Sequence, residues 1–284
     1  MKTAVKEIKK TPDVVIIQPS KGWVSLRLRD LWLYRELIYF LTWRDLKVRY
    51  KQSVLGVFWA VLKPFMNMVV FSIFFGSLAK MPSDGVPYPL FYFVGSLPWA
   101  LFGDSLSVAS RSLVSHGNMV SKIFFPRLII PLSSVMASVV DFLISFVILG
   151  GLMIYYKYAP TIYALWLPLL MLLALITSLG VGFWTSALMV RYRDVGYILP
   201  FVTNLWMFIT PVLYSASMIP EKWKVLYSLN PMTGVVEGFR EALLGTPPAL
   251  SPLLMGLSVL ISLIMFVSGM FYFRRMEKQF ADMI

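Results

Sequence analysis

The amino-acid sequence predicts an all-α fold, a polytopic membrane protein with six transmembrane helices preceded by an N-terminal amphipathic interface helix. Of its 284 residues, 58% are hydrophobic and only 14% are charged, whereas soluble domains carry roughly 25% charged residues. The apolar residues also gather into six stretches of about 20 residues, the length that crosses about 30 Å of hydrocarbon. Lipid is therefore the expected solvent for most of the chain.

Turn-forming residues separate the six stretches, as in the Pro-Ser-Asp-Gly run at 82–85. We expect spans over residues 54–79, 88–109, 129–155, 163–190, 197–214 and 253–273. The fifth span is short and contains Pro200 and Pro211, and proline removes a backbone donor from a helix. The six spans make up a transmembrane domain over residues 53–275.

Basic residues indicate on which side of the membrane the termini lie. An even number of spans places both ends on one side. The two termini and the connections on that side hold 20 Lys and Arg residues, against five in the other three connections. Because Lys and Arg accumulate in cytoplasmic segments, we expect cytoplasmic tails over 1–29 and 276–284. The same distribution accounts for the net charge of +12 without a nucleic-acid partner.

Residues 30–52 form the predicted interface helix. Leu33, Leu37 and Leu41 recur at helical spacing, which is typical of a helix with one apolar face. Trp32 and Trp43 are suited to the headgroup level, so we expect this helix to lie on the cytoplasmic leaflet and to contact membrane lipids. A soluble helix that packs on a cytoplasmic partner is the alternative.

The fourth span carries small residues at four-residue spacing, a pattern that lets helices approach closely. The residues of this stripe are Ala174, Ser178, Gly182 and Ser186. Packing within the subunit is the favoured interpretation, and a seam between two subunits is the alternative. The connection at 215–250 lies outside and holds an apolar run, which is either a re-entrant helix or an ordinary surface loop.

The sequence carries little chemistry of its own. It has no cysteine and one histidine, and it lacks the GxxxxGK[ST] loop that cradles phosphates. We therefore expect no catalytic residue, no metal site and no cofactor in this chain, and we interpret His116 as a solvated loop residue. Ionisable residues inside spans are functional candidates. They are few: Lys63, which is expected to extend toward the headgroups, Asp104 near the cytoplasmic headgroups, and Asp141 beside polar or basic partners. This scarcity indicates that another chain supplies the energy.

Three motifs in order carry a family resemblance. Residues 43–60 read WRDLKVRYKQSVLGVFWA, residues 191–195 read RYRDV, and Ile-Pro at 219–220 is followed by Asn-Pro at 230–231. The first motif resembles the opening segment of ABC-2 type permeases that export polysaccharides, including the O-antigen, teichoic-acid and capsule permeases. The resemblance extends over roughly residues 12–275.

The resemblance implies a transport subunit rather than an enzyme, which exports a polyprenyl-diphosphate-linked polysaccharide across the cytoplasmic membrane. It implies a homodimer bound to two copies of a separate nucleotide-binding ATPase subunit, which holds ATP and Mg. The segment between the second and third spans would contact that ATPase through Arg111, Lys122, Phe124, Phe125 and Arg127. An outer gate would involve Pro220, Trp223, Asn230 and Pro231.

A basic cluster at the end of the interface helix is the expected place for the diphosphate of the lipid carrier. It consists of Arg44, Lys47, Arg49 and Lys51. These charges lie at the inner headgroup level, and guanidinium groups hold phosphate oxygens through charge-assisted hydrogen bonds. The alternative is that the cluster only anchors the helix to anionic lipid.

Two other functions remain open at this stage. The first is an ABC-2 exporter of small lipophilic compounds, which needs no saccharide-sized conduit. The second is a polytopic lipid-linked glycosyl- or acyltransferase. The second is less supported, because the chain has no pair of carboxylates at metal-ligand spacing outside the spans and no His-Asp pair for acyl transfer.

Overall fold

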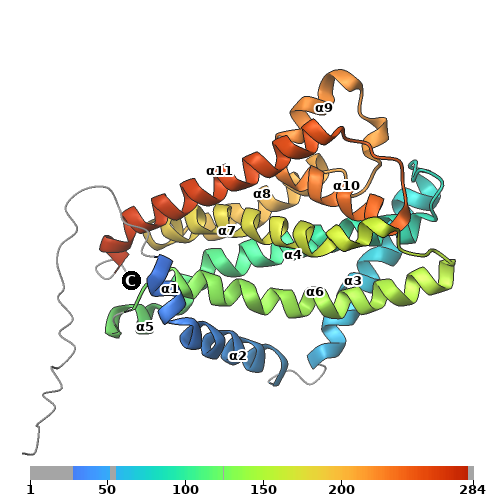
Figure 1. Cartoon of the computed structure of the whole chain (residues 1–284). Coiled ribbons are helices and arrows are strands. Elements are labelled where there is room, and N and C mark those ends of the chain that lie inside the picture. The colour runs from blue at the N-terminus through green and yellow to red at the C-terminus, as the bar shows by residue number, and fades with distance from the viewer. Residues whose placement is uncertain (1–27, 52–55, 124, 281–284) are drawn as a thin grey trace, which may run out of the picture.

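The computed structural model describes residues 28–51, 56–123 and 125–280, and all regular elements in these ranges are helical. The longer helices are α2 (Arg35–Lys51), α3 (Gly56–Phe71), α4 (Tyr88–Ser115), α6 (Ile129–Tyr156), α7 (Leu167–Arg191), α8 (Val195–Ile209), α10 (Pro231–Leu244) and α11 (Pro252–Met276). Figure 1 shows α4, α6 and α7 side by side along one axis and α3 steeply inclined to them. The shorter helices are α1 (Leu28–Leu33), η1 (Ser72–Leu78), α5 (Gly117–Lys122), η2 (Ile162–Trp166), η3 (Ala216–Met218), α9 (Glu221–Ser228) and η4 (Glu277–Gln279).

Four helices in the described residues are long and apolar enough to cross a membrane. They are Phe58–Leu78, Ile129–Tyr156, Ile162–Arg191 and Pro252–Gln279. They confirm the first, third, fourth and sixth expected stretches as long apolar helices. The fifth stretch is a shorter apolar helix, α8, of 15 residues, because Thr210 adopts an extended conformation and Pro211 cannot donate to the helix.

The second stretch is the central helix of the bundle, α4. It has 28 residues and packs against α3, α6, α7, α8 and α10. Its buried positions include Ser110 and Ser112. A helix enclosed by protein can hold these hydroxyl groups because the carbonyls of Leu106 and Ala109 accept their protons. Its mean hydropathy therefore falls below that of the lipid-facing helices, although its length is sufficient to span.

Helix α7 packs closely on two neighbours. The small-residue stripe at Ala174, Ser178, Gly182 and Ser186 is buried. A Cβ atom on Gly182 would lie 2.8 Å from the Cβ of Ala109 on α4. On the α11 side, a Cβ atom on Gly269 would lie 2.1 Å from the carbonyl oxygen of Gly180. Small residues thus let three helices approach within this chain, which confirms the expectation of packing within the subunit.

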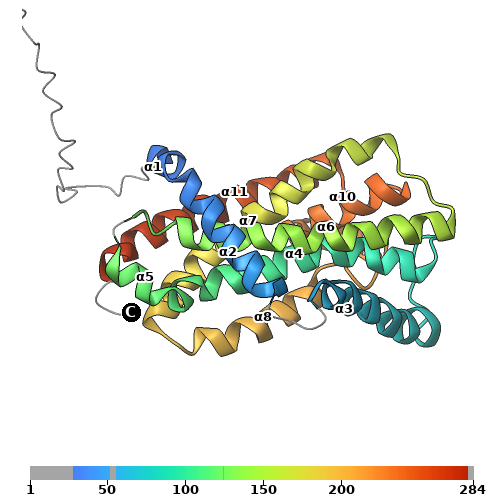
Figure 2. The same cartoon turned by 90° about the horizontal axis from the view of Figure 1, so that it is seen from below.

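Helix α2 packs on α6 and crosses it obliquely (Figure 2). Leu41 is buried in this contact, and the Thr42 hydroxyl lies 3.2 Å from the carbonyl oxygen of Ser133 on α6. Trp32 on α1 is 72% exposed and Tyr39 on α2 is also exposed. The interface helix thus packs one side on the bundle and presents aromatic rings on another, as lipid contact would require.

The two ends of the bundle differ in content. One end, here termed the α5 end, holds α5, the start of α6 and the end of α11 (Figure 1). The other, termed the α10 end, holds the connection from η1 to α4, the segment from α8 to α9, and α10 itself.

Candidate functional site

A cavity of about 770 Å³ lies between α3, α4, α6 and α8, next to the end of α2. Its lining combines aromatic rings with amides, hydroxyls and charges. The aromatic residues are Tyr50, Trp59, Phe71, Tyr92, Trp99 and Phe142, the uncharged polar ones are Asn67, Ser96, Ser107, Ser138, Ser145, Thr203 and Asn204, and the charged ones are Arg49, Lys63, Asp104 and Asp141. Flat rings pack on the C–H faces of sugars, and amides and hydroxyls can bond sugar hydroxyl groups.

The charges in the cavity form two pairs. Arg49 and Tyr50 at the end of α2 both donate hydrogen bonds to the carboxylate of Asp141 on α6, so the expectation of basic and polar partners for Asp141 is confirmed. The Nζ atom of Lys63 on α3 lies 4.0 Å from a carboxylate oxygen of Asp104 on α4. Lys63 and Asp104 therefore face the cavity and each other, whereas the sequence suggested the headgroups as their surroundings.

The four residues of the predicted diphosphate site point to different places. Arg49 faces the cavity. Arg44 turns toward the end of α4, where it bonds His116. Lys47 and Lys51 are exposed, and the Nζ of Lys47 lies 5.2 Å from the ring centroid of Trp43. Only Arg49 of this cluster lines the cavity, and its guanidinium already has a carboxylate partner.

His116 joins the interface helix to the end of α4. Arg44 donates to the Nε2 atom of His116, and the Nδ1 atom lies 2.8 Å from the carbonyl oxygen of Ser112. Because a guanidinium can only donate, Nε2 must accept, and we assign the proton to Nδ1 on that basis. The expectation of a solvated loop histidine is therefore wrong, since His116 is partly buried and hydrogen-bonded on both sides.

Asp45 completes this contact. Its carboxylate accepts a hydrogen bond of 2.9 Å from Arg44 and lies 3.8 Å from His116. Burial acts to raise the pKa of Asp45, whereas its hydrogen bond to Arg44 and the positive charge of that guanidinium act to lower it, and the pKa lies below its usual value. We call Arg44, Asp45 and His116 the α2–α4 joint.

A second polar contact joins the far side of the α5 segment, here residues 116–123 and 125–127, to the end of α11. The backbone N–H of Arg127 donates to a carboxylate oxygen of Glu277 at 3.0 Å, and its guanidinium donates to the Glu277 carbonyl. Arg274 donates to the other carboxylate oxygen of Glu277 at 2.6 Å. We call these three residues the α11 joint. The α5 segment is therefore connected to α2 on one side and to α11 on the other.

The predicted ATPase-contact residues are only partly exposed. Arg111 and Lys122 are exposed, but Arg127 is held by the α11 joint. Phe125 is only 6% exposed, so it packs into the core and is not available for the ATPase contact that the resemblance implied. Phe124 lies outside the described residues.

The predicted outer-gate residues separate into two pairs. The amide of Asn230 accepts from the indole N–H of Trp206 at 3.0 Å and donates to the hydroxyl of Thr210 at 2.8 Å, so it joins α8 to the start of α10. Pro231 begins α10 and is buried. Pro220 and Trp223 are exposed beside and on α9. The structure brings only Asn230 and Pro231 to the end of α8.

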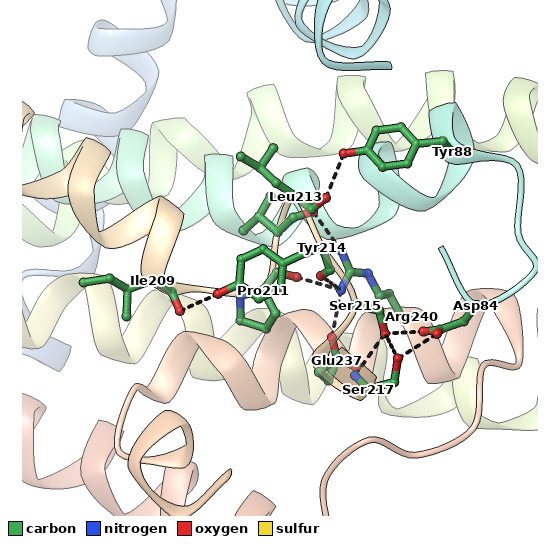
Figure 3. Close-up of polar contacts among 11 residues, drawn as sticks. Asp84, Tyr88, Ile209, Pro211, Leu213, Tyr214, Ser215, Ser217, Glu237 and Arg240 are labelled. Carbon is green, nitrogen blue, oxygen red and sulfur yellow. Dashed lines mark hydrogen bonds and ion pairs between the residues drawn. The ribbon is translucent and has the colours of Figure 1, made fainter. Parts of the chain in front are cut away.

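A buried ion pair at the α10 end was missed by sequence reasoning (Figure 3). Arg240 is 1% exposed, and its Nη1 atom lies 2.8 Å from a carboxylate oxygen of Glu237. The opposite charges of Glu237 and Arg240, three residues apart inside the apolar run of α10, were a signal in the sequence, because buried charges require partners and mark functional positions.

Comparison with known proteins identifies the family. Residues 36–244 match the family model of the ABC-2 type transporter. The chain belongs to the ABC-2 type transporter family. This ABC-2 permease is therefore a multi-pass membrane protein and the transport subunit of an ABC transporter, not itself an enzyme.

Relatives of this ABC-2 permease resemble it over most of its length. It is 30% identical to the O-antigen export system permease protein RfbA of Myxococcus xanthus, over 90% of this chain and 98% of that protein. It is 27% identical to an RfbA of Klebsiella pneumoniae, over 92% of this chain and 100% of that protein. It is 24% identical to the polysialic acid transport protein KpsM of Escherichia coli, over 71% and 78%.

Proposed function

We propose that this permease exports a polysaccharide carried on a polyprenyl diphosphate across the cytoplasmic, or inner, membrane. The observation that carries the proposal is the similarity to O-antigen export permeases along nine-tenths of the chain. The cavity supports it, because its mainly apolar lining includes rings such as Trp59 and Trp99 together with amides such as Asn67 and Asn204. A conduit for small lipophilic compounds would not need these amides.

The proposed architecture has six spans with both termini in the cytoplasm. The spans are α3 with η1, α4, α6, η2 with α7, α8, and α11, within the domain 53–275. The interface helix 30–52 would lie on the inner leaflet, and the segment 215–250 would form the outer side. In this orientation the α5 end faces the cytoplasm and the α10 end faces outward.

The proposed assembly is a homodimer bound to two copies of an ATPase subunit that holds ATP and Mg. Exposed apolar side chains on α3, η1 and α8 support a dimer on this side, among them Phe58, Phe74 and Phe201. Tyr197 on α8 is 83% exposed. At the other interface, α5 with Arg111 and Lys122 would dock on the ATPase.

Arg49 is the proposed point where the diphosphate reaches the cavity. Arg44, Lys47 and Lys51 would draw the anionic headgroup along α2. The Arg49 guanidinium already donates to the carboxylate of Asp141. To bind there, the diphosphate must displace this carboxylate, and its oxygens can accept hydrogen bonds in a similar geometry. An Arg44→Lys, Arg49→Lys double variant keeps both charges but loses bidentate geometry. We expect export to fall at least tenfold at unchanged protein level, whereas normal export would reduce the cluster to a membrane anchor.

The function is tested by deleting the gene and complementing it. Loss of the chain should abolish surface polysaccharide and leave lipid-linked polymer on the cytoplasmic side, and the wild-type gene should restore export. Undiminished surface polymer in the deletion strain, with no second copy present, would contradict the proposal.

A further inference from the structure

The segment of residues 210–217 lies just beyond the cavity at its α10 end. Helix α8 lines the cavity up to Met207 and ends at Ile209. On α4, the lining residue nearest this end is Tyr92, about one helical turn from Tyr88 at the start of the helix. We call residues 210–217 the α8 turn. Whatever fixes the α8 turn therefore fixes the end of the cavity.

Side chains donate hydrogen bonds to the backbone carbonyls of all four residues 211–214. The Arg240 guanidinium donates to three of them: Pro211 at 2.6 Å, Val212 at 2.8 Å and Tyr214 at 3.2 Å. The fourth, that of Leu213, accepts from the Tyr88 hydroxyl at 2.7 Å, as Figure 3 shows. Residues 211–213 are buried. Water could therefore not replace the donors to their carbonyls if those donors were removed.

The residues around the Arg240 guanidinium restrict its movement. Glu237 holds it from one turn earlier on α10, and its Cζ lies 3.8 Å from the ring centroid of Phe91 on α4. A Cβ atom on Gly95 would lie 2.7 Å from Nη2. Glycine at 95 is therefore the residue that makes room for the guanidinium between α4 and the α8 turn.

A second contact holds the far part of the α8 turn. The carboxylate of Asp84, in the connection before α4, accepts hydrogen bonds from the hydroxyls of Ser215 and Ser217, the latter at 2.9 Å. No residue of α8 itself is buried. The buried contacts at the α10 end are therefore made by the α8 turn and not by the helix that precedes it.

We propose that Arg240 is a positioning residue that keeps the α8 turn closed over the α10 end of the cavity. Opening the cavity outward then requires the guanidinium to break its hydrogen bonds to three backbone carbonyls together. This inference rests on the cavity being the transport path, as in the proposed function, but not on which substrate passes. It assigns the closing contact to Arg240 and Tyr88 rather than to the exposed residues of α9.

The test uses the full chain with its ATPase subunit in liposomes that contain trapped carboxyfluorescein, without nucleotide. An Arg240→Lys variant keeps the charge, but its single ammonium group cannot donate to three carbonyls in the arrangement that the planar guanidinium allows. Gly95→Ala displaces the guanidinium by contact while leaving Arg240 itself unchanged, and Tyr88→Phe removes one hydrogen bond. We expect dye release at least fivefold faster than wild type for the first two variants and about twofold for the third.

Hydrogen exchange of residues 210–217 in the same samples separates local opening from misfolding, and should rise there but not in α7 or α11. Gly150→Ala is the matched control for the glycine variant, because a Cβ atom there meets nothing within 4 Å. Arg193→Lys, at an exposed position, is the control for the arginine variant. Wild-type dye retention in well-folded Arg240→Lys and Gly95→Ala proteins would overturn the proposal, as would leakage equal to that of the controls. Loss of export with intact dye retention would leave the proposed function standing and refute the closing role.

Discussion

The two ends of the bundle use charged residues in opposite ways. At the α5 end, the α2–α4 joint and the α11 joint connect separate helices through partly exposed charged residues, as in the contacts of Arg44 with His116 and of Arg127 with Glu277. At the α10 end, Arg240 is fully buried and binds one carboxylate and three carbonyls. Exposed pairs contribute little and re-form easily, whereas a buried charge cannot lose its partners one at a time without a large cost. We therefore expect contacts at the α5 end to break and re-form singly, and contacts at the α10 end to break together.

The largest effect should follow from removing the buried charge. Arg240→Met leaves Glu237 buried without its ion-pair partner and the carbonyls of the α8 turn without donors. We expect a loss of about 3–5 kcal/mol in stability, measured by thermal unfolding in detergent. The exposed residue Arg193→Met is the control, and an equal effect of the two substitutions would remove the difference between the ends.

A smaller effect is expected at the α11 joint. Glu277→Gln keeps the side-chain shape but removes the charge that accepts from Arg127 and Arg274, a loss of roughly 1–3 kcal/mol for hydrogen bonds to charged groups. Since this joint connects the α5 segment to α11, export should fall several-fold while the complex still hydrolyses ATP. Equal losses of hydrolysis and export would show that the joint only supports folding or assembly.

The smallest effect is expected at the α2–α4 joint. Asp45→Asn should cost no more than about 1 kcal/mol, as for other partly exposed pairs. Because the pKa of Asp45 is lowered in the folded protein, its contribution is present above the ordinary value of 3.8 and is lost as the pH falls through the lower folded value. Wild type and variant should therefore differ in thermal stability by a constant amount between pH 5 and 8. A difference that changes within that range would assign the titration to another group.

The sequence predicted lipid-facing helices better than enclosed ones. Hydropathy reports contact with lipid, so α6 and α11 were placed to within a few residues, whereas α4 is a longer helix than expected because its enclosed end carries polar residues. The fifth stretch was extended past Ile209 because Pro211 and its neighbours are apolar, although they form a buried turn and not a helix.

Contacts between residues distant in the chain were the least predictable. Arg49 lies 92 positions before Asp141, and Arg127 lies 150 positions before Glu277, so no local pattern links them. Arg49 and Arg127 were accordingly interpreted as surface charges for external partners. Glu237 and Arg240 were different, because two opposite charges in an apolar helix already imply a buried pair.

Reconstituted transport tests the central claim most directly. The permease and its ATPase subunit would be incorporated together into vesicles that contain lipid-linked polysaccharide, with the ATPase facing out. Polymer should become protected from an added glycosidase only when both subunits and ATP are present. The permease alone should not hydrolyse ATP, since it lacks a phosphate-cradling loop. ATP hydrolysis by the isolated chain, or protection of the polymer without the ATPase, would contradict the account.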